Sequence, residues 1–127
     1  ELAVAQMFDK KIKLGNLFEF YGQLLTEKQQ EILEDYCILD LSFGEISEEL
    51  GISRQAVYDT IKRTEKQLDQ YEEKLGLAAR FEQRENAIRH LIDGMLEIDL
   101  KIREKAEAGD LLERISELVR EANAILE

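Results

Sequence analysis

The sequence contains no proline and no tryptophan, and it has only one cysteine and one histidine in 127 residues. A chain with 35% charged and 44% hydrophobic residues and no proline is typical of a nearly all-helical protein with a real core. The lone Cys37 excludes a disulfide framework and a thiolate cluster, and it indicates a reducing compartment. The lone His90, which we expect on the surface, excludes a histidine-rich metal site. The sequence therefore predicts an all-α fold without a metal.

Long apolar runs and phosphate-binding loops are also missing. No stretch approaches the roughly 20 apolar residues of a membrane span, and no signal peptide is visible. The seven glycines are scattered and form no P-loop. Carboxylate pairs such as Glu48–Glu49 and Glu72–Glu73 are more typical of solvated helix faces than of acid–base chemistry. We predict a cytoplasmic protein that is not an enzyme, binds no cofactor and does not insert into a membrane.

Positive charge is scarce throughout the chain, whose net charge is −11. Residues 1–76 hold 9 lysines and arginines against 16 aspartates and glutamates, a net charge of −7, and residues 77–127 have a net charge of −4. Non-specific DNA binding depends on neutralising phosphates, and free-standing DNA-binding domains usually carry a basic footprint. The charge therefore keeps open a second interpretation, an acidic adaptor that contacts a basic protein.

Residues 42–66, SFGEISEELGISRQAVYDTIKRTEK, predict two short helices joined by a tight turn. Ser42 and Glu45 can form a capping box, and Gly51 suits the left-handed position that ends a helix. Ser53 can cap the second helix. The apolar residues that would pack these helices into one corner are Ile46, Leu50, Ile52, Val57 and Ile61. The pattern predicts a helix-turn-helix, whose second helix commonly enters a major groove.

The predicted nucleic-acid contacts lie on the outer arc of that second helix. Gln55 can pair with adenine, and Arg54 lies where a first-turn side chain would meet phosphate or guanine. Tyr58 can either stack on a base or lie along its own domain. The basic side chains would hold the backbone. The candidate residues are Arg54, Gln55, Tyr58, Lys62, Arg63 and Lys66. The alternative for the whole set is an ordinary solvated helix face.

We divide the chain into an N-terminal segment (1–13) whose opening residues fray, a helix-turn-helix domain (14–76) and a C-terminal helical oligomerisation region (77–127). An amphipathic helix is expected from Leu14, and Thr26 with Gln29 predicts a capping box for a helix that runs to about residue 38. Cys37 is expected to be a small core residue. The helix that begins at residue 54 is expected to continue to Gly76.

An apolar seam along that long helix has two interpretations: it covers the first helix of its own domain, or it contributes to a dimer. The seam consists of Val57, Ile61, Thr64, Leu68, Tyr71 and Leu75.

After Gly76 a heptad pattern predicts a helical hairpin that forms a homodimer or a higher even-numbered oligomer. A break is expected at residues 108–110, between two amphipathic helices, and Gly94 lies within the first of them. One hairpin has a single sheltered seam, so apolar surface should remain for a second copy of the chain. The predicted interface residues are Phe81, Ile88, Leu91, Met95, Ile98 and Ile102.

Two segments carry a resemblance to known families. FEFYGQLLTEKQ and SFGEISEELGISRQAVYDTIKRTEKQLDQYEEKLG are similar to the YlxM family of small bacterial helix-turn-helix proteins, and the second also resembles region 4 of sigma factors. The resemblance covers about residues 14–76; Ser47 departs from the alanine usual in such motifs. It implies a regulatory or accessory role in the signal recognition particle pathway. The partners it implies are DNA or the particle's RNA, and the particle's GTPase, which the adaptor interpretation makes the main partner.

Overall fold

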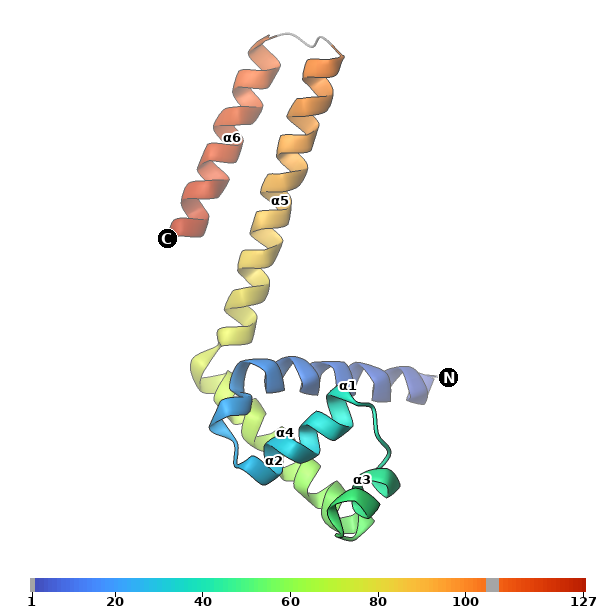
Figure 1. The fold of residues 1–127 in the computed structure, drawn as a ribbon. Helices are drawn as coiled ribbons and strands as arrows, with labels where there is room; N and C mark the ends of the chain where they lie inside the picture. Colours follow the sequence, from blue (N-terminus) through green and yellow to red (C-terminus); the bar gives the residue numbers. More distant parts are fainter. Residues whose placement is uncertain (1, 105–107) are drawn as a thin grey trace. The chain divides into compact units, whose positions relative to one another are not determined.

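The computed structural model describes residues 2–104 and 108–127, which form helices and turns and no strand (Figure 1). The predicted all-α helix-turn-helix class is therefore confirmed. The chain divides into two compact units, Glu1–Ala78 and Ala79–Glu127, close to the boundary expected after Gly76. None of the described helices is both long enough and apolar enough to span a lipid bilayer.

The first helix, α1 (Leu2–Tyr21), begins twelve residues before the predicted start at Leu14. The expected start at Leu14 was wrong because apolar residues continue upstream at helical spacing, without proline to stop the helix. Their side chains do not enter the core. The exposed apolar residues of this first half are Leu2, Val4, Met7, Phe8 and Ile12.

Two short turns flank the second helix. After η1 (Gly22–Leu24), α2 (Glu27–Leu33) begins with the predicted capping box, in which the Gln29 amide nitrogen donates to Thr26 Oγ1 at 3.2 Å. The helix was expected to continue to residue 38, but residues Glu34–Ile38 form a wider π-helical turn, η2. Cys37 in this turn packs against the core, and burial raises the pKa of its thiol to about 11.

The helix-turn-helix consists of α3 (Phe43–Leu50) and α4 (Arg54–Leu75). Its capping follows the prediction: Glu45 N donates to Ser42 Oγ at 3.1 Å, and Ala56 N donates to Ser53 Oγ at 3.0 Å. Gly51 ends α3 at φ 68°, a conformation that a residue with a Cβ adopts only at a steric cost. Ser47 donates from Oγ to the Ile52 carbonyl at 2.5 Å, so the serine ties the turn to α3.

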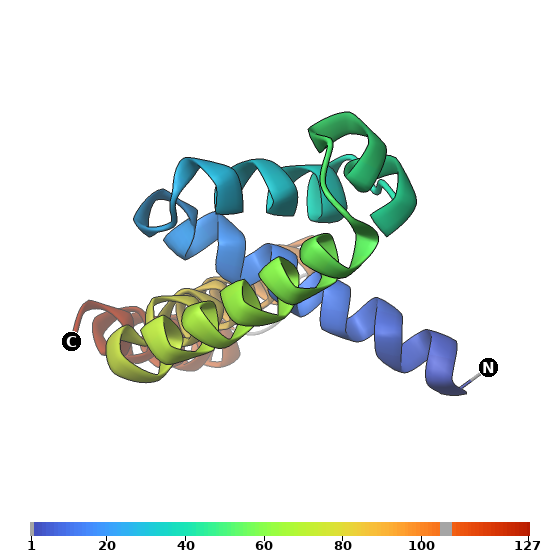
Figure 2. The ribbon, with the colours of Figure 1, turned by 90° about the horizontal axis from the view of Figure 1, so that it is seen from below.

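Helix α4 lies at the centre of the first unit and packs against α1, α2 and α3 (Figures 1 and 2). Figure 2 shows α1 crossing α4. The α4 seam is buried from Val57 to Leu68, where it packs within its own domain, whereas its last member, Leu75, is 44% exposed. The core consists of Leu14, Leu17, Tyr21, Leu25, Ile32, Leu33, Ile46, Val57, Ile61 and Leu68.

A buried tyrosine joins α1 to the end of α4. Tyr21 donates from its hydroxyl to Glu72 Oε1 at 2.6 Å and accepts the Leu77 backbone N–H at 3.0 Å. The same Glu72 oxygen accepts from Ala78 N at 3.0 Å. Burial, followed by the bond to Glu72, raises the pKa of Tyr21. These bonds tie the first residues after Gly76 (φ 61°), where α4 ends, to α1 and α4.

The second unit is an antiparallel pair of helices formed by α5 (Leu77–Arg103) and α6 (Ala108–Leu126) (Figure 1). The predicted break at residues 108–110 was wrong: they form the first turn of α6, where Asp110 complements the helix dipole. Gly94 is buried, and a Cβ there would lie well inside van der Waals contact with Leu118 and Arg114. The close approach of the two helices therefore explains why a glycine stands within α5.

Candidate nucleic-acid interface

The outward side of α4 presents part of the predicted contact set to solvent. Gln55, Lys62 and Lys66 are all exposed. Gln55 Nε2 donates to Asp59 Oδ1 at 2.9 Å, so a carboxylate lies among the predicted contacts. An aspartate there repels phosphate, but it can accept from the amino group of cytosine. The exposed pair is easily broken, so Gln55 remains available to a base edge.

Tyr58 lies partly along its own domain and partly in solvent, with 42% of its surface exposed. Its ring meets Phe43 of α3 edge-on, with centroids 5.9 Å apart, and Phe43 stacks on Tyr36 at 5.4 Å. The amine of Lys62 lies 5.7 Å from the Tyr58 centroid. The three rings form an aromatic cluster that holds Tyr58 in place from one side.

Arg54 lies apart from the other cations. Its guanidinium passes over the first turn of α3, where a Cβ added at Gly44 would lie only 3.0 Å from Arg54 Nη2. The side chain is exposed and faces the α3 side of the helix-turn-helix. Lys62 has a nearby carboxylate, Glu65, at 3.6 Å. Since this ion pair is at the surface, Lys62 can exchange Glu65 for a phosphate of the ligand at little cost in free energy.

The structure gathers three of the predicted basic residues around one shallow surface hollow of about 470 Å³. This hollow is lined by Asp59, Lys62, Arg63 and Lys66. Arg63 also borders a neighbouring hollow of about 280 Å³, whose other lining residues are Thr26, Lys28, Gln29 and Thr60. Lys28, at the start of α2, was not among the predicted contacts, because its place beside α4 depends on how α2 packs.

A third hollow, of about 210 Å³, lies between α1 and α4. Lys10 and Lys11 border it on the α1 side, and Tyr58, Lys62 and Glu65 border it on the α4 side. Neither α1 lysine was among the predicted contacts, because the helix was expected to start only at Leu14. Lysines at positions 10, 11 and 13 were the available signal, but only the helical register shows which of them reach the hollow.

The predicted oligomer residues of α5 fall into two groups. Phe81, Ile88, Met95 and Ile102 are 46–59% exposed. Leu91 and Ile98 are partly buried. The first group continues an exposed apolar stripe, and α6 carries another, made of Leu112, Ile115, Val119 and Leu126.

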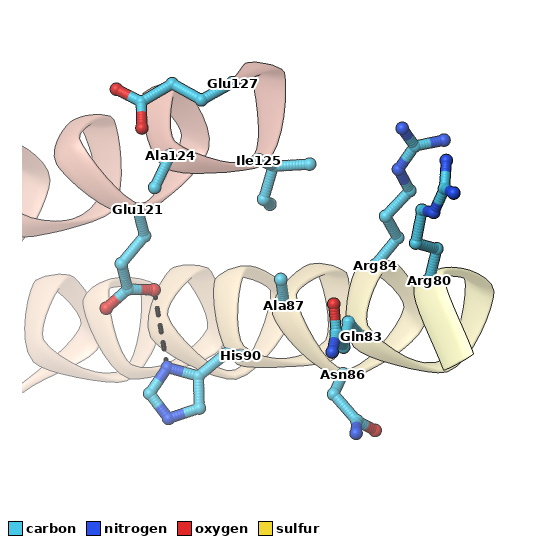
Figure 3. A pocket seen from close by; sticks show the side chains of 10 residues that line it. All are labelled: Arg80, Gln83, Arg84, Asn86, Ala87, His90, Glu121, Ala124, Ile125 and Glu127. Carbon is cyan, nitrogen blue, oxygen red and sulfur yellow. Dashed lines mark hydrogen bonds and ion pairs between the residues drawn. The ribbon is translucent and has the colours of Figure 1, made fainter. Parts of the chain in front are cut away.

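Near the end of α6, the second unit contains a hollow of about 720 Å³ (Figure 3). Ala87, Ala124 and Ile125 give it an apolar side, and Arg84 extends beyond them. His90 is exposed, as predicted, and its Nδ1 lies 3.4 Å from Glu121 Oε2. Among residues 2–104 and 108–127, no group of three histidine, cysteine or acidic side chains has the placement of a metal site.

Comparison with known proteins gives a consistent match. The model of the family described as "Putative helix-turn-helix protein, YlxM / p13 like" (UPF0122) matches residues 8–108. A UPF0122 protein of Halalkalibacterium halodurans is 53% identical over 85 residues, which cover 67% of this chain and 78% of that protein. A UPF0122 protein of Thermoanaerobacter sp. (strain X514) is 50% identical over 115 residues, covering 91% and 95%. The chain thus belongs to the YlxM/p13-like family of helix-turn-helix proteins.

Proposed function

We propose that this protein is a nucleic-acid-binding regulatory protein that uses α4 as its recognition helix. The observation that carries the proposal is the gathering of Lys62, Arg63 and Lys66 around one hollow on the outward side of α4. This cationic site lies in a unit whose sequence is strongly acidic, so it is a local exception to the charge of the molecule. Lysine and arginine contacts to phosphate supply most of the affinity of such complexes.

The biological setting that we propose is the signal recognition particle pathway in the cytoplasm. Membership of the YlxM/p13-like family supports it, through the role that the resemblance of residues 14–76 implies. The ligand would be duplex DNA or the RNA of the particle. We expect the protein to hydrolyse no nucleotides by itself. If the purified protein hydrolysed GTP, and a point mutation in the protein abolished that hydrolysis, this part of the proposal would be contradicted.

We also propose that the protein acts as a homodimer or a higher even-numbered oligomer formed through α5. The exposed residues Phe81, Ile88, Met95 and Ile102 support this proposal, because a soluble helix rarely leaves such a stripe uncovered. An assembly would also present more than one recognition helix to a ligand, which raises the effective affinity of a weak site.

The second candidate function is an acidic adaptor that contacts a basic partner such as the particle's GTPase. The observation that favours it is the charge of residues 1–76, where 16 carboxylates outnumber 9 cations. In that case the outward side of α4 would be an ordinary solvated face. Binding to the GTPase would persist when the basic residues of α4 are removed, whereas binding to nucleic acid would not.

The deciding experiment is a titration of the protein into labelled duplex DNA and into the particle's RNA, from low salt to physiological salt. We expect a dissociation constant of roughly 10⁻⁴–10⁻⁶ M at physiological salt. Replacing Lys62 or Lys66 by alanine should weaken the affinity for all nucleic-acid sequences alike. It should also reduce the slope of log K against log salt concentration by about one. Gln55→Ala should instead relax sequence preference.

The matched control is Lys74→Ala, which removes an exposed lysine in the last turn of α4, away from the hollow. It should leave binding nearly unchanged. Loss of Arg54, Gln55, Tyr58, Lys62 and Lys66 together should abolish binding while circular dichroism shows an intact fold. If nucleic-acid binding survives these five substitutions together, the adaptor function is favoured.

A further inference from the structure

Three hollows of the first unit adjoin one another around α4 through shared lining residues. The hollow between α1 and α4 shares Lys62 with the central hollow. The central hollow in turn shares Arg63 with the hollow beside α2. A ligand that follows these shared walls therefore passes from α1 over the recognition helix to α2. We call this surface the α1–α4–α2 path.

Charge is distributed very unevenly between this path and the rest of the first unit. Its lining includes two carboxylates, Asp59 and Glu65, and six cations: Lys10, Lys11, Lys28, Lys62, Arg63 and Lys66. The remainder of residues 1–76 has three cations and fourteen carboxylates. Lys11 is also paired with Asp40, and its amine lies 4.4 Å from the Tyr36 centroid. A polyanion would thus be attracted to the path and repelled by the remaining surface.

The α1 end of the path differs from the other two hollows in its chemistry. Its lining combines Tyr36, Phe43 and Tyr58 with the apolar side chains of Met7, Leu14 and Ile61. Lys10 and Lys62 come from opposite helices at its border. An aromatic surface bordered by lysines has the composition of sites that stack a base and hold its phosphates.

We propose that the α1–α4–α2 path binds a nucleic-acid strand with at least one unpaired base, which enters the aromatic hollow and stacks on Tyr58. This inference rests on the proposed function and narrows its ligand. In a duplex the base faces are stacked on one another, so a narrow hollow between two helices can take a base only when it leaves the stack. Phe43 and Tyr36 are positioning residues that hold the Tyr58 ring, and Lys10 binds the phosphate next to the inserted base.

The test compares one labelled sequence as a single strand and as a perfect duplex, in DNA and in RNA, by fluorescence anisotropy at fixed salt. The unmodified protein should bind the single strand at least about fivefold more tightly than the duplex, the lower end of what one base–aromatic stack contributes. The DNA and RNA arms show whether the 2′-hydroxyl matters. A 2-aminopurine base in the strand should change its fluorescence when it stacks in the hollow.

Matched variants locate the base. Tyr58→Leu should remove the preference for the single strand and the 2-aminopurine signal, whereas Tyr58→Phe keeps the ring and should retain both. Lys10→Gln should weaken single-strand binding, while Lys13→Gln removes the same charge from an exposed position of α1 that does not line the hollow. Thermal melts followed by circular dichroism check that each variant is folded.

The possible failures are distinguishable. Equal affinity for single strand and duplex, or a preference that survives Tyr58→Leu, would overturn the unpaired-base inference and leave the proposed nucleic-acid function standing. Failure of every nucleic acid to bind would overturn both. A labelled glutamate-rich peptide serves as the protein-like probe. If the peptide binds, if Lys10→Gln weakens its binding, and if no nucleic-acid strand displaces it, the path is a protein-binding surface.

Discussion

In the first unit, apolar side chains from α1, α2, α3 and α4 close around one core, with Ile32, Ile46 and Leu68 fully buried. In the described part of residues 79–127, only one large apolar side chain, Leu118, is buried. Ion pairs lie at the contact between α5 and α6 instead. Arg114 Nε lies 3.1 Å from Glu97 Oε2, and Arg114 Nη1 lies 2.9 Å from Glu117 Oε2. The apolar residues of α5 and α6 mostly face outward. The first unit is thus stabilised from within, whereas the second leaves most of its large apolar side chains exposed, which is the basis of the oligomer proposed above.

The strongest way to break this comparison is to put charge on the outward stripe of α5. Ile88→Asp together with Met95→Asp should convert an oligomer to monomers. Full burial of such a side chain contributes about 1.5–3 kcal/mol. About half of each is exposed, and both copies of a symmetric dimer contribute two, so losing them should cost the association about 3–6 kcal/mol. Light scattering combined with size-exclusion chromatography measures the change.

The matched control for that variant is Gln83→Asp with Asn86→Asp, which adds the same two charges at exposed polar positions of α5. It should leave the assembly intact. A monomeric unmodified chain at micromolar concentration would contradict the proposed oligomer and leave the outward stripe of α5 unexplained.

The next prediction concerns the core of the first unit. Leu68→Ala empties a fully buried position and should lower the free energy of unfolding by about 2–5 kcal/mol. Leu126→Ala makes the same chemical change at a position of α6 that is 84% exposed, and it should change stability by less than about 0.5 kcal/mol. Urea denaturation followed by circular dichroism compares the two. Similar losses in both variants would mean that the core does not stabilise the first unit as described.

Local sequence signals predicted the helix-turn-helix closely because each boundary depends on one residue and its near neighbours. Ser42, Gly51 and Ser53 act through bonds or backbone angles within a few positions, and the structure has all three where they were expected. The start of α1 and the π-helical turn at residues 34–38 were missed. The start of α1 depends on a local signal that was overlooked, the apolar spacing of residues 2–12, whereas the turn depends on contacts between distant segments, such as Lys11 with Asp40 and Cys37 beside Gly15.

The candidate site was predictable only in part for the same reason. Helical spacing places Lys62 and Lys66 on the outer arc of α4, but it does not show that α1 brings Lys10 beside Tyr58. The position of Arg54 over Gly44 likewise depends on the angle between α3 and α4. A residue on a single helix can thus be assigned a face from sequence, whereas a hollow shared by several helices requires the fold.

Gly94 allows the weak seam of the second unit to be tested directly. Gly94→Ala should favour the α5 helix by up to about 1 kcal/mol in propensity. The new methyl group would nevertheless overlap Leu118 and Arg114, and such overpacking typically costs about 1–3 kcal/mol. We therefore expect net destabilisation of the hairpin, measured as faster amide hydrogen exchange in α5 and α6.

Gly109→Ala is the control for the glycine experiment, since a Cβ there would have no described heavy atom within 4 Å. It should be neutral or stabilise the protein by about 0.4–1 kcal/mol. If Gly94→Ala were also stabilising, the close approach of α5 and α6 would not be maintained in solution.

The smallest expected effect concerns a pair of carboxylates within the first unit. A hydrogen bond with Asp35, followed by repulsion from its charge and from Glu31, raises the pKa of Glu49 above its ordinary value of about 4.3. Because the native state then keeps a proton that the unfolded state has lost, this pair should stabilise the protein as pH falls from above the raised pKa of Glu49 to about 4.3. Glu49→Gln imitates the protonated form, so it should raise the urea midpoint at pH 7 and reduce the rise of that midpoint as pH falls toward about 4.3. Glu48→Gln removes the same charge from the neighbouring exposed residue and should leave that slope in place. A lower midpoint for Glu49→Gln at pH 7 would show that the two carboxylates do not repel each other in the folded protein.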